Sequence, residues 1–259
     1  MKMKAIIRVV LVVAAMAGCS GYSLPANAAG DAPHAPEQDW SFNGMFGTYD
    51  RAAMQRGFKV YKNVCSACHG MEHLRYRNLS ALGYNENQVK NIAADYMVTD
   101  GPNDEGEMYQ RMALPSDPFV SPYPNDNAAK YANGGALPPD LSLITKARHG
   151  GADYIYALLT GYSDDHHGVD VPDGKYYNEY FPGHVISMAP PLADDIVPYE
   201  DGTPQTVEQY SKDVSHFLTW AADPYMEDRK RIGLRVILFL LVFAGIMYAY
   251  KRQLWAKLH

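Results

Sequence analysis

The sequence predicts a mainly α-helical domain with long loops, followed by one transmembrane helix near the C-terminus. Three observations lead to this prediction. The chain begins with a segment of export-signal type, it contains amphipathic helix patterns separated by stretches rich in proline and glycine, and it carries a 19-residue apolar run near its end.

The first 28 residues have the pattern of a cleaved export signal. Lys2, Lys4 and Arg8 form a positive head, about ten apolar residues follow, and Ala26 to Ala29 supplies the small residues that a signal peptidase cuts. The apolar run is short for a permanent anchor, which is the alternative interpretation. We therefore expect residues 1–28 to be removed.

The apolar run Ile232–Tyr250 predicts a transmembrane helix. Its 19 residues, at a rise of about 1.5 Å each, match the thickness of a bilayer core. Its one charge, Arg235, lies near the start, from where it can snorkel to the headgroups, and Trp255 suits the far interface. We expect the helix and its lead-in over residues 225–250 and a cytoplasmic tail over 251–259.

The part between signal and span is acidic. The whole chain has 23 basic and 29 acidic residues, whereas residues 29–228 have 13 basic and 29 acidic, a net charge of −16. This balance repels nucleic acid and attracts basic partners. The charges on either side of the span are nearly balanced, so the positive-inside rule does not orient it. The export signal instead places domain 29–224 outside the cytoplasm and the C-terminus inside.

The only two cysteines after the first 20 residues stand in the stretch NVCSACHG. A redox dithiol, half a zinc site and a haem attachment site share this Cys-x-x-Cys spacing. A thioredoxin-like motif needs a preceding strand, and zinc needs about four N or S ligands, and neither is visible in the sequence. Cys-x-x-Cys-His is typical of c-type haem attachment. We predict that Cys65 and Cys68 bind haem c through two thioether bonds and that His69 is the first axial iron ligand.

The best candidate for the second axial ligand lies in FPGHVISMAPPLADD. The prolines and glycine around Met188 exclude a helix and favour a stiff, extended loop that would hold a thioether at a fixed distance from iron. His184 is the rival ligand, and bis-histidine ligation would give a lower potential than histidine–methionine ligation. The local sequence leaves both open.

Two stretches predict amphipathic helices. In TYDRAAMQRGFKVYKN, Ala53, Gly57 and Tyr61 share one face, and the small Gly57 would let another helix approach closely. In TPQTVEQYSKDVSHFLTWAADP, Thr206 and Gln209 form a capping-box pattern. The second helix presents an apolar stripe made of Val207, Tyr210, Val214, Phe217, Leu218 and Ala221.

The segments between these helices predict shorter elements. PPDLSLITKARHGG, residues 138–151, predicts a helix capped by Asp140 and stopped by Gly150 and Gly151. ADYIYALLTGY predicts a second helix, ended by Gly161. DGPNDEGE and PSDPFVSPYPNDN predict loops. Pro224 breaks the last helix of the domain before the span.

Taken together, these motifs resemble the cytochrome c1 family, the haem-bearing subunits of quinol–cytochrome c reductase complexes, in its bacterial form. The resemblance runs in order over about residues 38–255 and rests on CSACHGMEHLRYRNLSALGY, ALPPDLSLITKARHGGADYIYALLTGY, YFPGHVISMAPPL, DGTPQTVEQYSKDVSHFLTWAADP and the span with its basic flanks. It implies a cytochrome c-like fold whose first and last helices cross. It also implies that Met188 is the sixth ligand and that Arg148 contacts a haem propionate, where a solvated helix-end arginine is the alternative.

The resemblance further implies the function. Haem c would accept an electron from a Rieske iron–sulfur protein and pass it to a basic c-type cytochrome, with cytochrome b and membrane lipid as neighbours in a bacterial inner membrane. With His69 and Met188 on the iron, no position is open for substrate, so the chain would catalyse no bond chemistry by itself. An exported haem enzyme of peroxidase type, with an open distal site, is the alternative. Some bacterial relatives brace the methionine loop with a disulfide, for which this chain lacks the cysteines.

Overall fold

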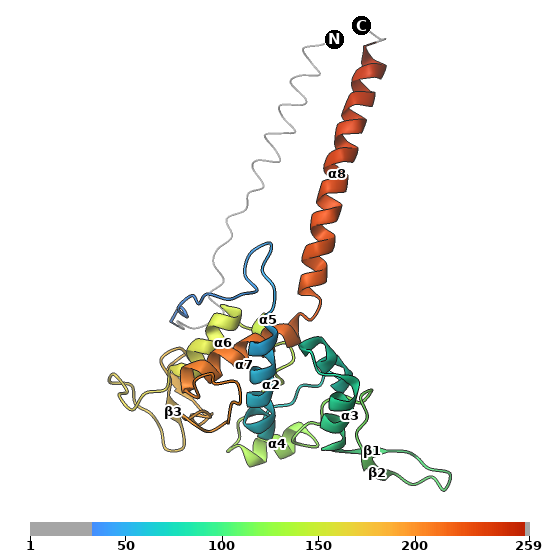
Figure 1. Ribbon diagram of the computed structural model, residues 1–259. Helices are drawn as coiled ribbons and strands as arrows, with labels where there is room; N and C mark the ends of the chain where they lie inside the picture. The colour runs from blue at the N-terminus through green and yellow to red at the C-terminus, as the bar shows by residue number, and fades with distance from the viewer. Residues whose placement is uncertain (1–32, 257–259) are drawn as a thin grey trace, which may run out of the picture.

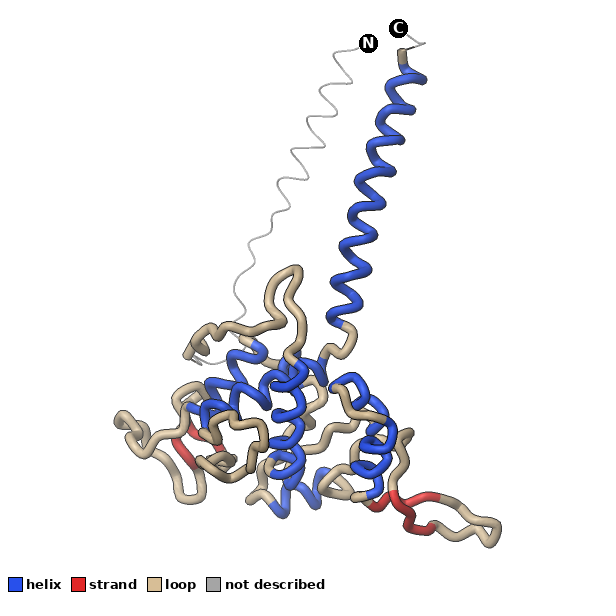
Figure 2. The backbone as a smooth tube through the Cα atoms, viewed as in Figure 1, coloured by secondary structure: helices blue, strands red, loops and turns tan. Residues whose placement is uncertain are grey.

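The computed structural model describes residues 33–256 and places a mainly helical domain at one end of a single long helix (Figure 1). Loops make up much of the domain (Figure 2). The mainly α-helical class with long loops is therefore confirmed. The helices are α2 (Arg51–Asn63), α3 (Glu86–Ala94), α4 (Asp126–Ala132), α5 (Ile144–Ala147), α6 (Gly151–Thr160), α7 (Val207–Ala222) and α8 (Met226–Trp255), with 3₁₀ turns η1 (Cys65–Ala67) and η2 (Tyr76–Leu82).

Helices α2 and α7 cross at the centre of the domain. At the crossing, a Cβ on Gly57 would stand 2.0 Å from the carbonyl oxygen of Asp213 on α7, so only glycine permits the approach. α7 begins directly after the predicted cap, Thr206, and α2 begins three residues after the start of the predicted stretch, Thr48. The Asp50 carboxylate accepts from the first turn of α2, and the Thr206 hydroxyl accepts from the N–H of Gln209 at 3.3 Å. The predicted crossing of the first and last helices of the domain is confirmed.

The core of the domain forms around this crossing. Of the apolar stripe predicted on α7, Val207 is half-buried and the other members are buried. The Phe217 ring contacts the rings of Phe58 and Tyr61 on α2, with centroids 5.6 and 5.8 Å apart. Beside them, Arg56 makes two hydrogen bonds of 2.9 Å to Asp213, whose side chain is only 1% exposed. A paired charge thus lies at the edge of an aromatic core.

Two short hairpins complete the domain. β1 (Met97–Asp100) pairs antiparallel with β2 (Tyr109–Met112), and β3 (Tyr176–Tyr177) pairs with β4 (Val185–Ile186). The predicted loop DGPNDEGE forms the tip of the first hairpin, which projects away from α8 (Figure 1). The sequence did not predict these strands, because they are short and the first pair is mostly exposed, which leaves no hydrophobic alternation.

The helix predicted over residues 138–151 is wrong in extent. Only α5, a single turn, is helical there, and Leu143 rather than Asp140 precedes it, without a side-chain cap. The Asp140 carboxylate instead accepts from the N–H of Ser142 at 2.8 Å and of Glu72 at 2.9 Å. A contact to a distant segment therefore holds this aspartate, which a local capping pattern cannot reveal. Gly150, in the left-handed region at φ +82°, separates α5 from α6.

The C-terminal helix leaves the domain core after its first residue, Met226, which is buried in that core. α7 ends just before Pro224, as predicted, and α8 begins at Met226. α8 is 30 residues long and contains the apolar run, so it is long and apolar enough to span a membrane. None of the residues in its most apolar stretch is buried against the domain. The export signal predicted for residues 1–28 lies outside the described residues.

Candidate functional site

The Cys-x-x-Cys-His motif directly follows α2. The N–H groups of Cys68 and His69 both donate to the carbonyl oxygen of Cys65, at 3.1 and 2.9 Å. The Tyr61 hydroxyl at the end of α2 donates to the carbonyl of His69 at 3.2 Å. One tight turn, fixed to a core helix, therefore carries both sulfur atoms and the imidazole.

The chemistry of the cysteines differs from that of a redox dithiol. Cys65 and Cys68 form no disulfide with each other. Burial raises the pKa of the Cys65 thiol to about 12, whereas a reactive dithiol needs a lowered thiol pKa. Within residues 33–256, no group of three or more His, Cys, Asp or Glu side chains is arranged to hold a metal ion. Two thiols beside a histidine, one of them with a raised pKa, fit thioether attachment of haem.

The His69 ring is oriented by one hydrogen bond. Its Nδ1 lies 2.8 Å from the carbonyl oxygen of Pro139. A carbonyl can only accept, so Nδ1 carries the proton and Nε2 keeps its lone pair. Burial lowers the pKa of His69, which favours the neutral ring. A neutral imidazole with an unprotonated Nε2 is the form that coordinates iron, so the residues fit a haem ligand.

The segment that supplies Pro139 is tied along the motif. The N–H of Leu141 donates to the carbonyl of Gly70 at 2.9 Å, and Asp140 accepts from Glu72 as described above. These contacts place the proline carbonyl beside the histidine ring. The role of Pro139 could not be predicted, because the partners lie 70 residues apart and a backbone carbonyl has no residue signature.

A second missed contact reaches Cys68. The Tyr123 hydroxyl lies 3.9 Å from its sulfur, and the side-chain amide of Asn133 at the end of α4 donates to that hydroxyl at 3.1 Å. Tyr123 belongs to the stretch PSDPFVSPYPNDN, whose prolines predict a loop. Part of this loop thus forms a wall of the motif.

Met188 lies in the loop that follows β4 and is half-buried. Its carbonyl accepts from the hydroxyl of Tyr162, just past α6, at 3.1 Å, and Lys175 contacts Ser187 at 2.6 Å. Hydrogen bonds and a short strand pair therefore brace the loop.

His184, the rival ligand, lies at the turn before β4. Its backbone adopts φ +61°, and its ring stacks on Tyr177 with centroids 5.7 Å apart. Its Nδ1 is buried and has no hydrogen-bond partner among residues 33–256. The Tyr177 ring thus covers one face of the imidazole.

Arg148 is the residue that ends α5, and it is exposed. It lies close to Tyr154 of α6, since burial raises the pKa of that tyrosine and the guanidinium opposes the rise. Arg148 forms no ion pair with a carboxylate in the described part of the chain. The three motif residues therefore share one turn. Arg148 instead lies beside Tyr154 of α6, and Met188 accepts a hydrogen bond from Tyr162 just after α6.

Comparisons with known proteins agree with this architecture. The model of the Cytochrome C1 family matches residues 40–258. A cytochrome c1 of Rhodospirillum rubrum is 47% identical over 269 residues, which cover 98% of this chain and 98% of that protein. A mitochondrial protein of Arabidopsis thaliana named cytochrome c1, heme protein, is 48% identical over 252 residues, covering 96% and 81%. A protein of Bradyrhizobium diazoefficiens named cytochrome b/c1 is 50% identical over 256 residues, covering 90% of this chain but 37% of that protein. The chain belongs to the cytochrome c1 family.

Proposed function

We propose that this chain is the membrane-anchored cytochrome c1 of a quinol–cytochrome c reductase and that it transfers electrons without catalysing bond chemistry by itself. The observation that carries the proposal is the hydrogen bond from His69 to the Pro139 carbonyl, which holds the histidine of the attachment motif in the form that coordinates iron. Family membership supports one covalently bound haem c.

The haem would be held by residues from separate segments of the domain. Cys65 and Cys68 would form the thioether bonds, and His69 and Met188 would be the axial ligands. Two axial protein ligands suit an electron carrier, because iron then has no open position. Arg148 would contact a propionate, a role that its exposed guanidinium supports, since it forms no ion pair with a carboxylate in the described part of the chain.

The proposed partners define the path of the electron through haem c. We propose that haem c accepts electrons from a Rieske iron–sulfur protein and delivers them to a basic c-type cytochrome. Cytochrome b would be the neighbour in the membrane, which the relative named cytochrome b/c1 supports. The domain net charge of −16 over residues 29–228 suits a basic acceptor.

The export signal supports an orientation. Residues 29–224 would lie in the periplasm of a bacterial inner membrane, residues 225–250 would form the span with its lead-in, and residues 251–259 would lie in the cytoplasm. A periplasm-dependent reporter fused after His259 should be inactive, and an active one would reverse this orientation.

Quinol-driven reduction tests the function. In the purified membrane complex, added quinol should reduce haem c, and removal of the Rieske protein should abolish this reduction while dithionite still reduces the haem. Haem c that ignores quinol but turns over peroxide would instead indicate an exported peroxidase.

A further inference from the structure

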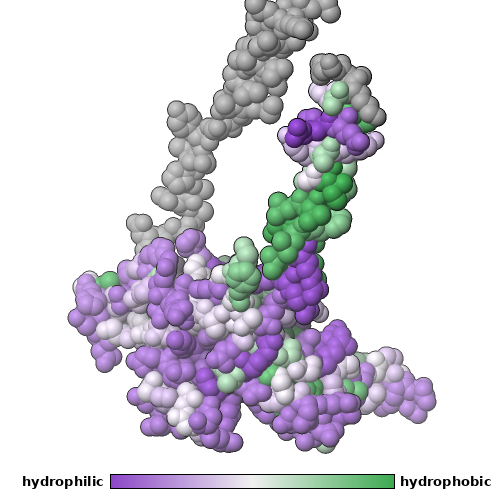
Figure 3. Space-filling view, turned by 45° about the horizontal axis from the view of Figure 1, so that its top comes forward, coloured by the Kyte–Doolittle hydropathy of each residue, from purple (hydrophilic) through white to green (hydrophobic). Residues whose placement is uncertain are grey.

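A loop of the haem domain projects beside the start of α8. It runs over residues 42–48 and rises along the helix in the same direction as the span (Figures 1 and 2). Its tip carries two large apolar side chains, Met45 and Phe46, which are 63% and 78% exposed. In the space-filling view, a hydrophobic patch of the domain lies next to the hydrophobic band of α8 (Figure 3). Two adjacent apolar side chains at a loop tip are unfavourable in water and favour a surface that covers them.

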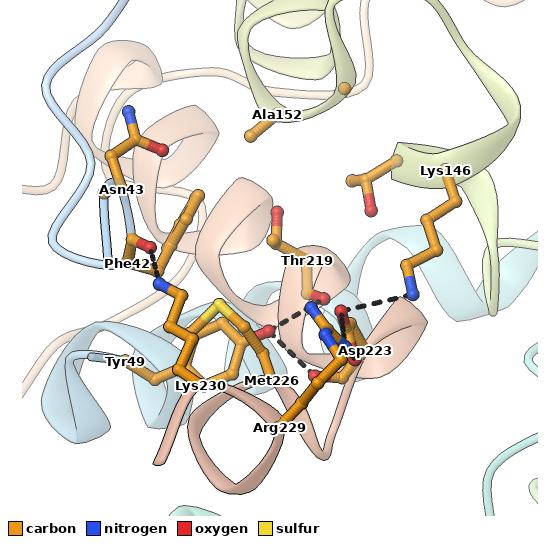
Figure 4. Close-up of a pocket in the computed structure, with 13 residues that line it drawn as sticks. Phe42, Asn43, Tyr49, Lys146, Ala152, Thr219, Asp223, Met226, Arg229 and Lys230 are labelled. Atoms are coloured by element: carbon orange, nitrogen blue, oxygen red, sulfur yellow. Dashed lines mark hydrogen bonds and ion pairs between the residues drawn. The ribbon is translucent and has the colours of Figure 1, made fainter. Parts of the chain in front are cut away.

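The loop is fixed to α8 at both ends. Lys230 of α8 donates through Nζ to the carbonyl of Phe42 at 2.7 Å and to that of Gly47 at 3.1 Å, and Figure 4 shows the first of these bonds. Just after the loop, the N–H of Tyr49 donates to the carboxylate of Glu227 at 2.7 Å. Because both roots of the loop bind the first turns of α8, the tip is held at a set position along that helix.

That position coincides with the start of the span. Met45, Phe46 and Leu234 line one pocket of about 250 Å³ between the loop and the helix. Leu234 belongs to the apolar run Ile232–Tyr250 of α8, the helix that is long and apolar enough to span a membrane. The loop tip therefore lies at the depth where the hydrocarbon core begins.

The charges around the tip match a lipid headgroup layer. Lys230 and Arg231 of α8 line the same pocket, and Arg229, also on α8, lines a second pocket that shares Lys230. Arg229 and Arg231 also pair with Asp223 and Asp228, at 2.7 and 2.6 Å. Apolar side chains beside cations whose stems run along the surface are typical of segments that lie in a membrane interface. The three cations lie among three acids, Asp223, Glu227 and Asp228, so these six charges balance, whereas the domain as a whole is strongly acidic.

We propose that the loop tip is a second membrane contact of the haem domain, in which Met45 and Phe46 enter the bilayer interface while the exposed side chain of Arg231 faces lipid phosphates. A single helix leaves a domain free to rotate and tilt about its root. A second contact, rigidly tied to that helix, sets the orientation of the domain over the bilayer and thereby the direction in which its electron-transfer face points.

Spin labels at three positions test the contact. We would place one label per chain at Phe46→Cys, at Leu241→Cys within the span, and at Tyr131→Cys on α4, which is 92% exposed at the side of the domain away from α8. The full haem-loaded chain would be studied in nanodiscs and in the purified complex. Collision rates with oxygen, which concentrates in lipid, and with a water-soluble nickel chelate report the surroundings of each label.

We expect the ratio of the oxygen to the nickel collision rate to be several-fold higher at position 46 than at position 131 and to approach the ratio at position 241. A ratio equal to that at 131 would place the tip in water and overturn the proposal. A label at 46 that is shielded from both reagents would mean that a protein covers the tip, which also overturns it. The unmutated chain should take up no label, and an unchanged thermal midpoint should show that each labelled domain is folded.

Discussion

The imidazole of His69 donates through Nδ1 to the backbone carbonyl of Pro139 over 2.8 Å. The two residues lie in segments 70 positions apart, which the bond from Leu141 to Gly70 and the contacts of Asp140 hold side by side. The bond selects the tautomer and fixes the plane of the ring. The proposed haem site is thus preorganised by backbone contacts that no single residue type specifies.

Replacing the proposed sixth ligand should change the potential but not the attachment of haem. Met188→Leu should keep haem bound, because two thioether bonds hold it. It should lower the midpoint potential by on the order of 0.1 V, within the range of about 0.8 V over which axial ligands tune haem. Redox titration measures this. His184→Leu is the matched control and should leave the potential unchanged, whereas the opposite pattern would make His184 the ligand.

Adding one methyl group at the helix crossing should destabilise the domain. In Gly57→Ala the new Cβ would meet the Asp213 carbonyl at 2.0 Å and the Phe217 Cβ at 2.8 Å, so α2 and α7 must separate. Overpacking of this kind costs about 1–3 kcal/mol, which thermal unfolding followed by haem absorbance would detect. Gly233→Ala meets no atom within 4 Å and should leave the midpoint unchanged. An unshifted midpoint for Gly57→Ala would mean that the crossing is looser than the structure indicates.

The predictions that succeeded from sequence rest on local signals. α2, α7 and α8 carry caps, an apolar period or an uninterrupted apolar run, and each begins and ends within a few residues of the predicted bounds. The errors arise where contacts are long-range. Asp140 looked like a helix cap because its partner, Glu72, is remote in sequence, and the β1–β2 hairpin has exposed strands without alternation. The same reason hid the roles of Pro139 and Tyr123, which act on the motif from other segments.

The ion pair between Arg56 and Asp213 should contribute more to the free energy of unfolding than the exposed ion pairs near it. Removing one partner of a buried pair leaves a charge without compensation and costs about 3–5 kcal/mol. We expect Asp213→Ala to approach the lower value, because Arg56 keeps a second contact, to Asp201 at 2.9 Å. Glu200→Ala is the control: that carboxylate is 91% exposed and lies 3.4 Å from Lys59, so its loss should cost under about 1 kcal/mol in denaturant titration. Equal losses in both variants would argue against a buried pair.

Stability should fall in mild acid through His216. Its ring is 4% exposed and lies against Trp40 and Phe42, and its Nδ1 has no hydrogen-bond partner in the part of the chain that the structure describes. Burial lowers its pKa below the ordinary 6.5. As the pH falls, His216 is therefore protonated in the unfolded chain before it is protonated in the folded protein. The free energy of unfolding consequently declines as the pH drops below about 6.5. In His216→Leu the decline between pH 6.5 and about 5 should be smaller, as urea titrations at each pH would measure. His167→Leu, with an exposed ring, should retain the full decline.

Salt should slow electron transfer to a basic cytochrome if the acidic surface guides the partner. The Debye length falls from roughly 30 Å at 0.01 M to 10 Å at 0.1 M salt, so long-range attraction fades over this range. Among the acids on either side of the Met188 loop in sequence, Asp194 accepts from the N–H of Val207 at 2.9 Å and so also stabilises the start of α7. Asp164 and Asp165 are exposed, which makes them the better pair to neutralise.

The double variant Asp164→Asn, Asp165→Asn should therefore flatten the dependence of the second-order rate on salt, because two charges that attract the partner are removed. The control pair Asp104→Asn, Glu105→Gln lies at the tip of the first hairpin, equally exposed but in a separate part of the domain (Figure 1). It removes the same net charge and should change the slope less. Stopped-flow mixing with a basic cytochrome c measures both slopes. If the two pairs flatten the dependence equally, only the net charge attracts the partner, and if the unmutated rate is flat in salt, these acids have no part in docking.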